Sequence, residues 1–502
     1  MGDEHNLRLP AWKAGVNRAE GLLARIFQPQ DDRSSRAIHW LGLAGLFSFG
    51  FLIWGMFYSW GDFPLDFLDW AEVFGPRFAI LQDAARTGQF PLHVADTTAL
   101  RGVTDRYLAT ADTPISPQYL LLRFLDLSPF MFWNTVLLYT VGFIGLLLFY
   151  RKYQLSLWSF SLLFFLFFFN GHIIAHLGVG HASWVGYFLQ PFFLYLLFEL
   201  VERQQVNWKW TLGLALTLLA ILLQGHFHLF VWCLLLLGLV GLFNLRLLKP
   251  ILMAGAFSVL VSLPRLLPPA LVVARVTHEP LGGFATWTDL LGSLVVLRDP
   301  DRAFAVIPSN LFPLSWWELD HFIGLFGAAL LLIFGIILPL RSDRRKQGLP
   351  VQLLAPSLIL AGLSVGRLYN DLVGLVPLPP FTGERVTARF LSLALLVVLF
   401  LAVITVDRWV KARKFESWQF VLMLAASVMM VYDLEQHLRA WRIRYLDGLT
   451  YLFPKVPFDA ARHVVSNHSD PLYVGLLVGG SLVALVTLAF LVYQARREPK
   501  VK

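Results

Sequence analysis

Long apolar runs alternate with short charged segments along most of the chain. A helix of about 20 apolar residues is long enough to cross a bilayer. The runs predict 12 membrane spans and therefore an all-α polytopic membrane protein. We expect the spans at residues 38–60, 129–150, 155–170, 184–201, 210–225, 227–245, 250–274, 322–340, 350–365, 390–406, 417–432 and 472–493.

The distribution of basic residues predicts the orientation of these spans. Lysine and arginine collect in the N-terminal segment 1–37, at the C-terminus and in alternate short connections, which is typical of cytoplasmic segments. Both termini are therefore predicted to be cytoplasmic, in a multi-pass protein of the bacterial inner or plasma membrane. These anchors account for the net charge of +8, so the charge gives no reason to expect a nucleic-acid partner.

The longest connections all fall on the predicted outer face, at residues 61–128, 275–321, 366–389 and 433–471. Loops of such length usually carry function. We divide the chain into the cytoplasmic segment 1–37, a transmembrane module at 38–410 and C-terminal helices at 411–502. Many secondary transporters have a matched pair of broken helices, one in each half of the chain. The two halves of this sequence show no such pair, which weakens the case for a transporter.

Three carboxylates follow the first span. Asp62, Asp66 and Asp69 have the spacing i, i+4 and i+7, which would place them on one face of a helix. Acidic side chains at the edge of a membrane bundle are costly unless they bind a cation or move a proton. The alternative is a solvated face on which Asp62 caps the helix.

Histidines gather where spans three to six reach the outer face. His172 and His176 have the spacing of a helical metal pair, and His181, His226 and His228 follow on the same side. Histidines in such a cavity can ligate a metal, carry protons or bind sugar hydroxyls. The alternative is a set of interfacial side chains whose nitrogens bond to the backbone.

Arginines are expected on the same face. Arg265 lies in a proline-rich stretch at the end of span seven, while Arg385 and Arg389 precede span ten with i, i+4 spacing. Guanidinium groups suit bidentate capture of phosphate oxygens. The alternative is that each arginine extends to lipid headgroups.

Several of these segments resemble YfhO-like membrane proteins of the GT-C glycosyltransferase superfamily. The first is Asp62-x3-Asp66-x2-Asp69-Trp70, followed by Gly88-Gln89-Phe90-Pro91-Leu92. Leu263-Pro264-Arg265-Leu266-Leu267-Pro268 is similar to the proline-broken seventh span of that family, and Phe381 through Phe390 to its arginine-containing segment. The likeness covers residues 38–410 in separate pieces, and His93 and Thr387 differ from the family pattern.

The resemblance implies a glycosyltransferase that uses a polyprenyl-phosphate-linked sugar as donor on the outer face. The acceptor would be a glycan, a lipid or a protein of the cell envelope. Asp62 or Asp66 would match the catalytic carboxylate, and Arg385, Arg389 and Arg265 would bind the lipid phosphate. Asp69 and the five histidines would line the substrate cavity. The sequence establishes no cofactor, and a divalent cation is the candidate.

Two other functions fit the same features. The first is a transporter or a flippase for lipid-linked sugars, in which the carboxylates and histidines couple ions to movement. The second is a non-catalytic membrane subunit that retains the scaffold.

Overall fold

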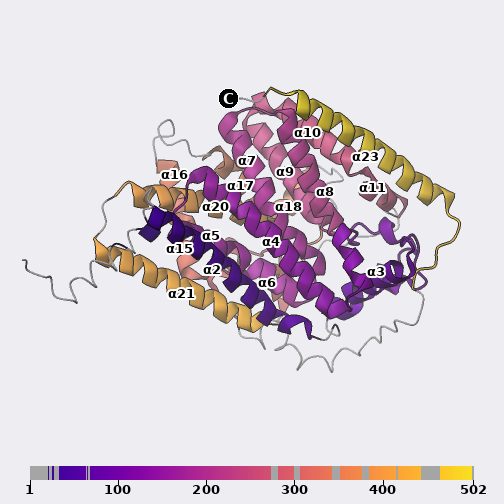
Figure 1. Ribbon diagram of the computed structural model, residues 1–502, viewed down its shortest axis with the longest axis horizontal. Coiled ribbons are helices and arrows are strands. Elements are labelled where there is room, and N and C mark those ends of the chain that lie inside the picture. Colours follow the sequence, from indigo (N-terminus) through magenta and orange to yellow (C-terminus); the bar gives the residue numbers. More distant parts are fainter. Residues whose placement is uncertain are drawn as a thin grey trace, which may run out of the picture.

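The computed structural model describes residues 21, 25–27, 33–63, 65, 68–272, 281–298, 306–341, 351–375, 384–413, 416–442 and 464–499. Helices dominate this part of the chain (Figure 1), and the strands β1 (Val306–Ile307) and β2 (Leu314–Ser315) form one small antiparallel ribbon. The prediction of an all-α membrane protein is confirmed at this level.

Within the described ranges, eight helical stretches are long and apolar enough to cross a membrane. They are Arg36–Phe57, Leu127–Tyr153, Leu157–Gly178, Ala182–Arg203, Trp316–Arg341, Thr387–Lys411, Trp418–Trp441 and Pro471–Arg497. A bent pair, Leu245–Val261 with Leu263–Leu271, adds a candidate span with a break of 69°. Three shorter apolar helices are Trp208–Leu223, Phe227–Phe243 and Leu354–Leu363.

The helix α20 (Phe390–Lys411) forms the centre of the bundle. Its apolar side chains surround the whole helix, and the most apolar part is completely buried, as expected for a helix without a polar face. It packs against α5 (Leu157–Phe168) and α17 (Leu354–Leu363). By contrast, α21 (Ser417–Trp441) and α23 (Pro471–Arg497) lie on opposite edges of the bundle (Figure 1).

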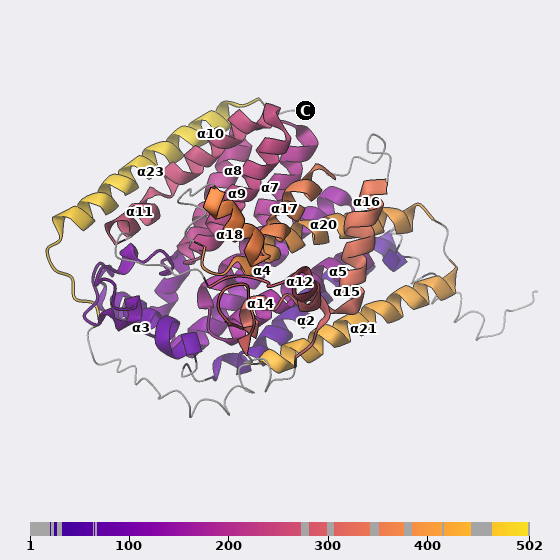
Figure 2. The same ribbon diagram turned by 180° about the vertical axis from the view of Figure 1, so that it is seen from behind.

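The remaining helices complete the bundle around this centre. They are α2 (Arg33–Phe57), α4 (Leu127–Tyr153), α6 (Gly171–Gly178), α7 (Gln190–Arg203), α8 (Trp208–Leu223), α9 (Phe227–Phe243), α10 (Leu245–Val261), α11 (Leu263–Leu266), α15 (Gly324–Leu330) and α16 (Leu338–Arg341). Seen from behind, α12 (Trp287–Val295), α14 (Trp316–Leu319) and α18 (Gly366–Leu375) lie in front of the bundle (Figure 2).

Polar side chains connect the helix ends that are predicted to be cytoplasmic. Lys152 at the end of α4 is 2.7 Å from Glu202 on α7, and Lys411 is 2.6 Å from Asp407 on α20. The Asp407 carboxylate also accepts from the Ser156 amide. Segments that are distant in the sequence therefore meet at one end of the bundle.

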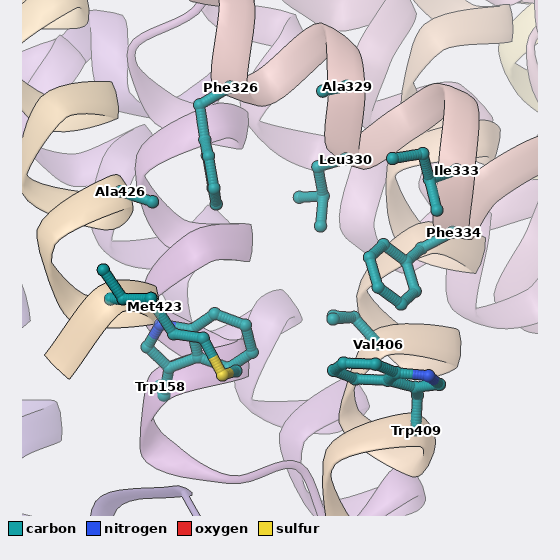
Figure 3. A pocket seen from close by; sticks show the side chains of 11 residues that line it. Trp158, Phe326, Ala329, Leu330, Ile333, Phe334, Val406, Trp409, Met423 and Ala426 are labelled. Atoms are coloured by element: carbon teal, nitrogen blue, oxygen red, sulfur yellow. The ribbon is translucent and has the colours of Figure 1, made fainter. Parts of the chain in front are cut away.

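An apolar pocket of about 290 Å³ opens near this same end, between α5, α15, α20 and α21 (Figure 3). Trp158, Phe326, Met423 and Trp409 are among its lining residues. None of its lining residues carries a charge.

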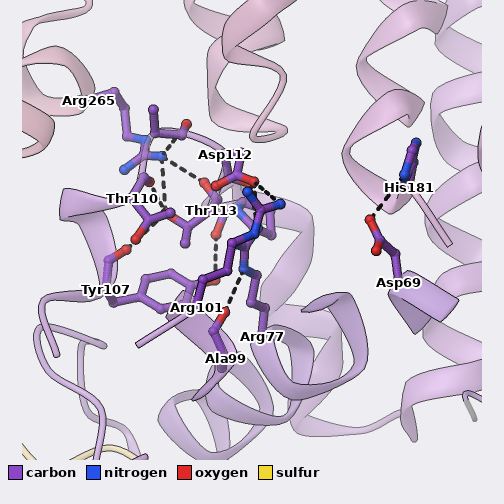
Figure 4. Close-up of polar contacts among 12 residues, drawn as sticks. Asp69, Arg77, Ala99, Arg101, Tyr107, Thr110, Asp112, Thr113, His181 and Arg265 are labelled. Atoms are coloured by element: carbon purple, nitrogen blue, oxygen red, sulfur yellow. Dashed lines mark hydrogen bonds and ion pairs between the residues drawn. The ribbon is translucent and has the colours of Figure 1, made fainter. Parts of the chain in front are cut away.

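The segment between α2 and α4 folds into short helices that cover the other end of the bundle. Its longest helix is α3 (Gly75–Thr87), and the buried Arg77 guanidinium fixes it by donating to the carbonyl of Ala99 and pairing with Asp112 at 3.1 Å. Arg265 on α11 reaches the same segment and donates to the carbonyls of Leu108, Ala111 and Thr113 (Figure 4). This first outer segment is thus anchored from two sides.

The carboxylates at the start of this segment do not lie on one helix. A 3₁₀ turn ends at Gly61, which has a φ of +88°, and the next helical element, η2 (Trp70–Phe74), begins eight residues after Asp62. Leu68 has a φ of +43°, in the left-handed region that interrupts a right-handed helix. The spacing of Asp62 and Asp69 therefore does not bring them to a common face.

The helix α21 ends at Trp441, beyond the predicted boundary at 432. Its last turns are held by a buried contact, because His437 Nε2 and Trp441 Nε1 lie 2.8 and 2.9 Å from the Asp320 carboxylate. The helix therefore continues past residue 432 because its last turns bond to Asp320, which is distant in the sequence.

Candidate functional site

A cluster of aromatic side chains marks the covered end of the bundle. Trp184 lies on the 3₁₀ helix η6 (Ala182–Leu189), and the rings of His172, His176 and His226 surround it at centroid distances of 4.5, 4.2 and 4.2 Å. His172 and His176 are one turn apart on α6, which Asn170 caps by accepting from the Ile173 amide. These rings are almost completely buried.

A buried ion pair adjoins this cluster. Arg389, at the start of α20, donates from Nε and Nη2 to the two carboxylate oxygens of Glu318 on α14, at 2.7 and 2.6 Å. The Arg389 guanidinium lies 5.5 Å from the centre of the Trp184 ring, and His176 Nε2 is 3.5 Å from Glu318. The Glu318 carboxylate therefore neutralises the charge of Arg389 and fixes its plane.

At the mouth of the cluster, the first outer segment contributes a carboxylate. Asp69 Oδ2 lies 3.1 Å from His181 Nε2, and the two side chains are 28% and 13% exposed (Figure 4). Burial opposes the charged form of Asp69, but His181 and Arg101 outweigh it and lower the pKa of this carboxyl. His181 Nδ1 is buried and has no partner among the described residues.

Gly180 makes the contact between Asp69 and His181 possible. It has a φ of +98°, and a Cβ at this position would lie 2.3 Å from the Trp70 amide nitrogen. The Asp69 amide also donates to the Val179 carbonyl at 3.2 Å. Only glycine accommodates both this backbone conformation and the close approach of the first outer segment.

Arg385 brings a further positive charge to the same region, near the carboxylates of Glu318 and Glu384. The side chain is half-buried and forms no ion pair within the described part of the chain, and its Nε atom is buried without a partner. Burial and the nearby charges of Arg101 and Arg389 lower the pKa of Arg385. Positive groups that repel one another in this way favour the binding of an anion.

His228 and Glu384 extend the polar region toward α9. His228 Nδ1 and Trp232 Nε1 lie 3.0 and 2.9 Å from the Glu384 carboxylate. Glu384 directly precedes Arg385 in the sequence, so this contact positions the segment that carries the free guanidinium. Burial opposes the charged form of Glu384, but His228, Arg389 and Trp232 together outweigh it and lower the pKa of this carboxyl.

The structure thus brings together Asp69, His172, His176, His181, His226, His228, Arg385 and Arg389 at one end of the bundle. Asp62 is exposed and lies at the end of a turn, while Asp66 is outside the described residues. Arg265 is 2% exposed, and its guanidinium contacts backbone carbonyls of the first outer segment.

Four residues of the site were not selected from the sequence, namely Trp184, Glu318, Glu384 and Arg101. Glu318 and Glu384 belong to the long outer segments, where an acidic side chain normally indicates solvent exposure. The burial of Glu384 beside His228 follows from tertiary packing alone.

The donor atoms of this region are widely spaced. In the described ranges, no three of the clustered histidine, aspartate and glutamate side chains bring donor atoms within 4.8 Å of one another. The region instead combines a hydrogen-bonded carboxylate–imidazole pair with a free guanidinium, which suits proton removal and anion binding.

The apolar pocket of Figure 3 is separate from this region. Its lining residue Val406 is 17 positions along α20 from Arg389, which corresponds to roughly 25 Å at the rise of an α-helix.

Comparisons with protein-family models, with curated proteins and with solved structures found no match for this chain.

Proposed function

We propose that the protein is an integral-membrane glycosyltransferase of the GT-C type, which moves a sugar from a polyprenyl-phosphate donor to an acceptor on the outer face. In this proposal the eight long apolar helices, the bent pair and the three shorter apolar helices form 12 spans, with both termini in the cytoplasm. The site then opens to the outside, where the lipid-linked donor is presented.

The observation that carries this proposal is the Asp69–His181 contact of 3.1 Å at the same end of the bundle as three guanidinium groups. Arg101 and Arg389 attract the Asp69 carboxylate, and both repel Arg385, which also feels the charges of Glu318 and Glu384. Sugar transfer needs a base that removes the proton of the acceptor hydroxyl and a positive group that stabilises the anionic leaving group. The carboxylate–imidazole pair and the guanidinium groups supply these two functions.

The chemistry follows from the orientation of His181. Its Nε2–H donates to Asp69, which leaves the Nδ1 lone pair without a partner among the described residues. Nδ1 is buried in this structure, so in this proposal the bound acceptor displaces the side chains that cover it, and Nδ1 then accepts the proton of the acceptor hydroxyl. The hydroxyl oxygen forms a bond to the anomeric carbon as the bond between that carbon and the phosphate oxygen breaks. Arg385 and Arg101 stabilise the charge that develops on the departing lipid phosphate, and a single displacement inverts the anomeric configuration.

We assign the base to the Asp69–His181 pair rather than to Asp62 or Asp66, which the family resemblance favours. Asp62 is exposed, and it makes no contact with the arginines among the described residues. Arg389 is occupied by Glu318 and has a positioning role, since it holds the cluster beside Arg385.

Release of polyprenyl phosphate tests this function directly. Protein in vesicles is incubated with polyprenyl-phosphate-linked hexoses, one sugar per reaction, together with envelope membranes as acceptor. We expect Asp69→Asn and His181→Ala to lower the rate by about 10²–10⁴-fold, while Asp62→Asn serves as the matched carboxylate control and retains it. Equal rates in Asp69→Asn and the parent would exclude the proposed base.

Binding of farnesyl phosphate tests the anion site separately from turnover. A charge-assisted hydrogen bond contributes about 1.5–3 kcal/mol, so Arg385→Ala should weaken binding by about 10–100-fold. Arg385→Lys should recover only part of the affinity, because an ammonium group lacks the planar fork. Unchanged affinity in Arg385→Ala would reduce this residue to a headgroup anchor.

Ion-coupled transport of a lipid-linked sugar is the second candidate function. It is favoured by the continuous contacts between the buried rings of His321, His172, His176 and His181, at centroid distances of 4.8, 4.4 and 5.0 Å. Such a row can pass protons. Movement of a fluorescent lipid-linked sugar across vesicles, driven by a pH gradient and without release of polyprenyl phosphate, would establish transport in place of transfer.

A further inference from the structure

The first outer segment contacts the residues that precede α23. The residues of this junction are different from those of the histidine cluster. Val94 and Val465 form an isolated antiparallel bridge, the Ala95 amide donates to the Val464 carbonyl, and the Ser466 amide donates to the His93 carbonyl. This backbone pairing brings three potential metal ligands together.

We propose that His93, Asp105 and His468 form a zinc site at this junction. One donor atom from each side chain lies within 4.8 Å of the other two, and His468 Nε2 is already 3.4 Å from Asp105 Oδ2. Ligand atoms about 2.0–2.1 Å from a tetrahedral zinc ion lie about 3.3 Å from one another. Side-chain movements of up to about 1.5 Å would complete this geometry, and they include a separation of the His93 and His468 rings, whose centroids are 3.9 Å apart.

The second observation is the environment of the His93 ring. The residue is completely buried, yet its Nδ1 atom has no hydrogen-bond partner in the described part of the chain. A buried polar atom without a partner costs about 1–3 kcal/mol. A metal ion at Nδ1 supplies the missing partner.

The other nitrogen of His93 has the support that metal-bound histidines usually have. His93 Nε2 lies 3.3 Å from Asp470 Oδ2, and Arg106 Nε donates to the same oxygen at 2.6 Å. A carboxylate that accepts from the distal nitrogen fixes the tautomer and makes the ligating nitrogen a better donor. Asp470 is thus the orienting partner of His93 and remains outside the ligand set.

The donor set favours zinc over calcium or magnesium. Two imidazole nitrogens and one carboxylate are typical zinc ligands, whereas calcium and magnesium prefer oxygen atoms alone. His468 and Asp105 are partly exposed, at 55% and 40%, so an ion and a fourth water ligand reach the site from solution. Bound zinc would fasten the start of α23 to the first outer segment.

Cobalt binding tests the site with a spectroscopic readout. The full-length protein is purified on an affinity tag without histidine, stripped with a chelator and titrated with Co²⁺ and then Zn²⁺. We expect one equivalent of Co²⁺ with the visible absorption of tetrahedral coordination, and its displacement by Zn²⁺. His468→Ala and Asp105→Asn should abolish this signal, and Asp470→Asn should weaken binding by about 10–100-fold.

Two control variants separate this site from other regions. Asp126→Asn removes an exposed carboxylate of the same outer segment, and His181→Ala removes a histidine of the buried cluster. Both should retain the tetrahedral signal and the parent affinity. Co²⁺ binding of unchanged stoichiometry and affinity in both His468→Ala and Asp105→Asn, or loss of the signal in His181→Ala alone, would overturn the assignment.

Discussion

Arg265 should act as an anchor for the first outer segment, and Arg265→Ala should release that anchor. The guanidinium is 2% exposed, and all its hydrogen bonds in the described structure go to residues 108–113. The contact to the Thr113 carbonyl is short, at 2.7 Å, while those to Leu108 and Ala111 are 3.3 Å. A phosphate ligand would have to displace these acceptors.

The contact lengths give the magnitude of the effect. A hydrogen bond from a charged donor contributes about 1.5–3 kcal/mol. We count the short contact at its full value and the two longer contacts as weak. On this basis, Arg265→Ala should reduce the free energy of local opening by about 3 kcal/mol. This change corresponds to an opening equilibrium about 100-fold more favourable.

Hydrogen exchange monitored by mass spectrometry measures this opening. Amides in peptides that cover residues 107–115 should exchange about 100-fold faster in Arg265→Ala, because local opening limits their exchange. Arg86→Ala is the matched control, since Arg86 belongs to the same outer segment and pairs with the highly exposed Asp126. Exposed pairs contribute little, so exchange there should change only slightly.

The opposite result would restore the phosphate-binding role. If exchange of residues 107–115 is the same in Arg265→Ala and in the parent, the contacts to the carbonyls do not anchor the segment. A concurrent loss of farnesyl phosphate affinity in that variant would then identify Arg265 as a ligand of the lipid phosphate.

Further predictions concern charge and topology. Glu318→Gln leaves the Arg389 guanidinium buried without a counter-charge and should cost about 3–5 kcal/mol of stability; the midpoint of thermal unfolding should fall, and the double variant Glu318→Gln, Arg389→Met should recover part of the loss. Burial opposes the charged form of Asp112, but two neighbouring arginines hold its pKa below the unfolded value. Its contribution to stability is therefore present above about pH 4 and lost as the pH falls further, and Asp112→Asn should remove this part of the acid sensitivity of unfolding. A membrane-impermeant maleimide should label Gln89→Cys only from outside and Arg151→Cys only from the cytoplasm, and the reverse pattern would invert the proposed orientation.

The apolar runs were sufficient to predict an all-α protein with several membrane-length helices, because the length needed to cross a bilayer is a local property of the sequence. Of the 12 predicted spans, eight have a counterpart of full length among the described residues, and the count of 12 stays a prediction. The exceptions are residues held by distant partners. The helix α21 continues to Trp441 because His437 and Trp441 bond to Asp320, which is more than 100 positions away in the sequence. No local pattern contains that contact.

The acidic residues after the first span show the limit of helical spacing as an argument. The pattern of Asp62 and Asp69 assumes a continuous helix, but the positive φ value at Leu68 interrupts it. Asp69 lies in the site for a different reason. Gly180 allows the first outer segment to approach the end of α6 closely. The sequence Gly180-His181 alone does not predict this approach, because the segment that contacts it lies about 110 positions earlier in the chain.

The two arginines before α20 illustrate how tertiary contacts divide residues that the sequence treats alike. Arg385 and Arg389 have the spacing of a phosphate clamp, yet Glu318 forms a salt bridge with Arg389, while Arg385 forms none with any of the described residues. A buried, paired arginine contributes a fixed geometry, and an unpaired one retains the electrostatic attraction that binds an anion. Arg385 is therefore the guanidinium of this pair whose charge is available to a ligand, and Glu318 decides this outcome from a segment about 70 residues earlier.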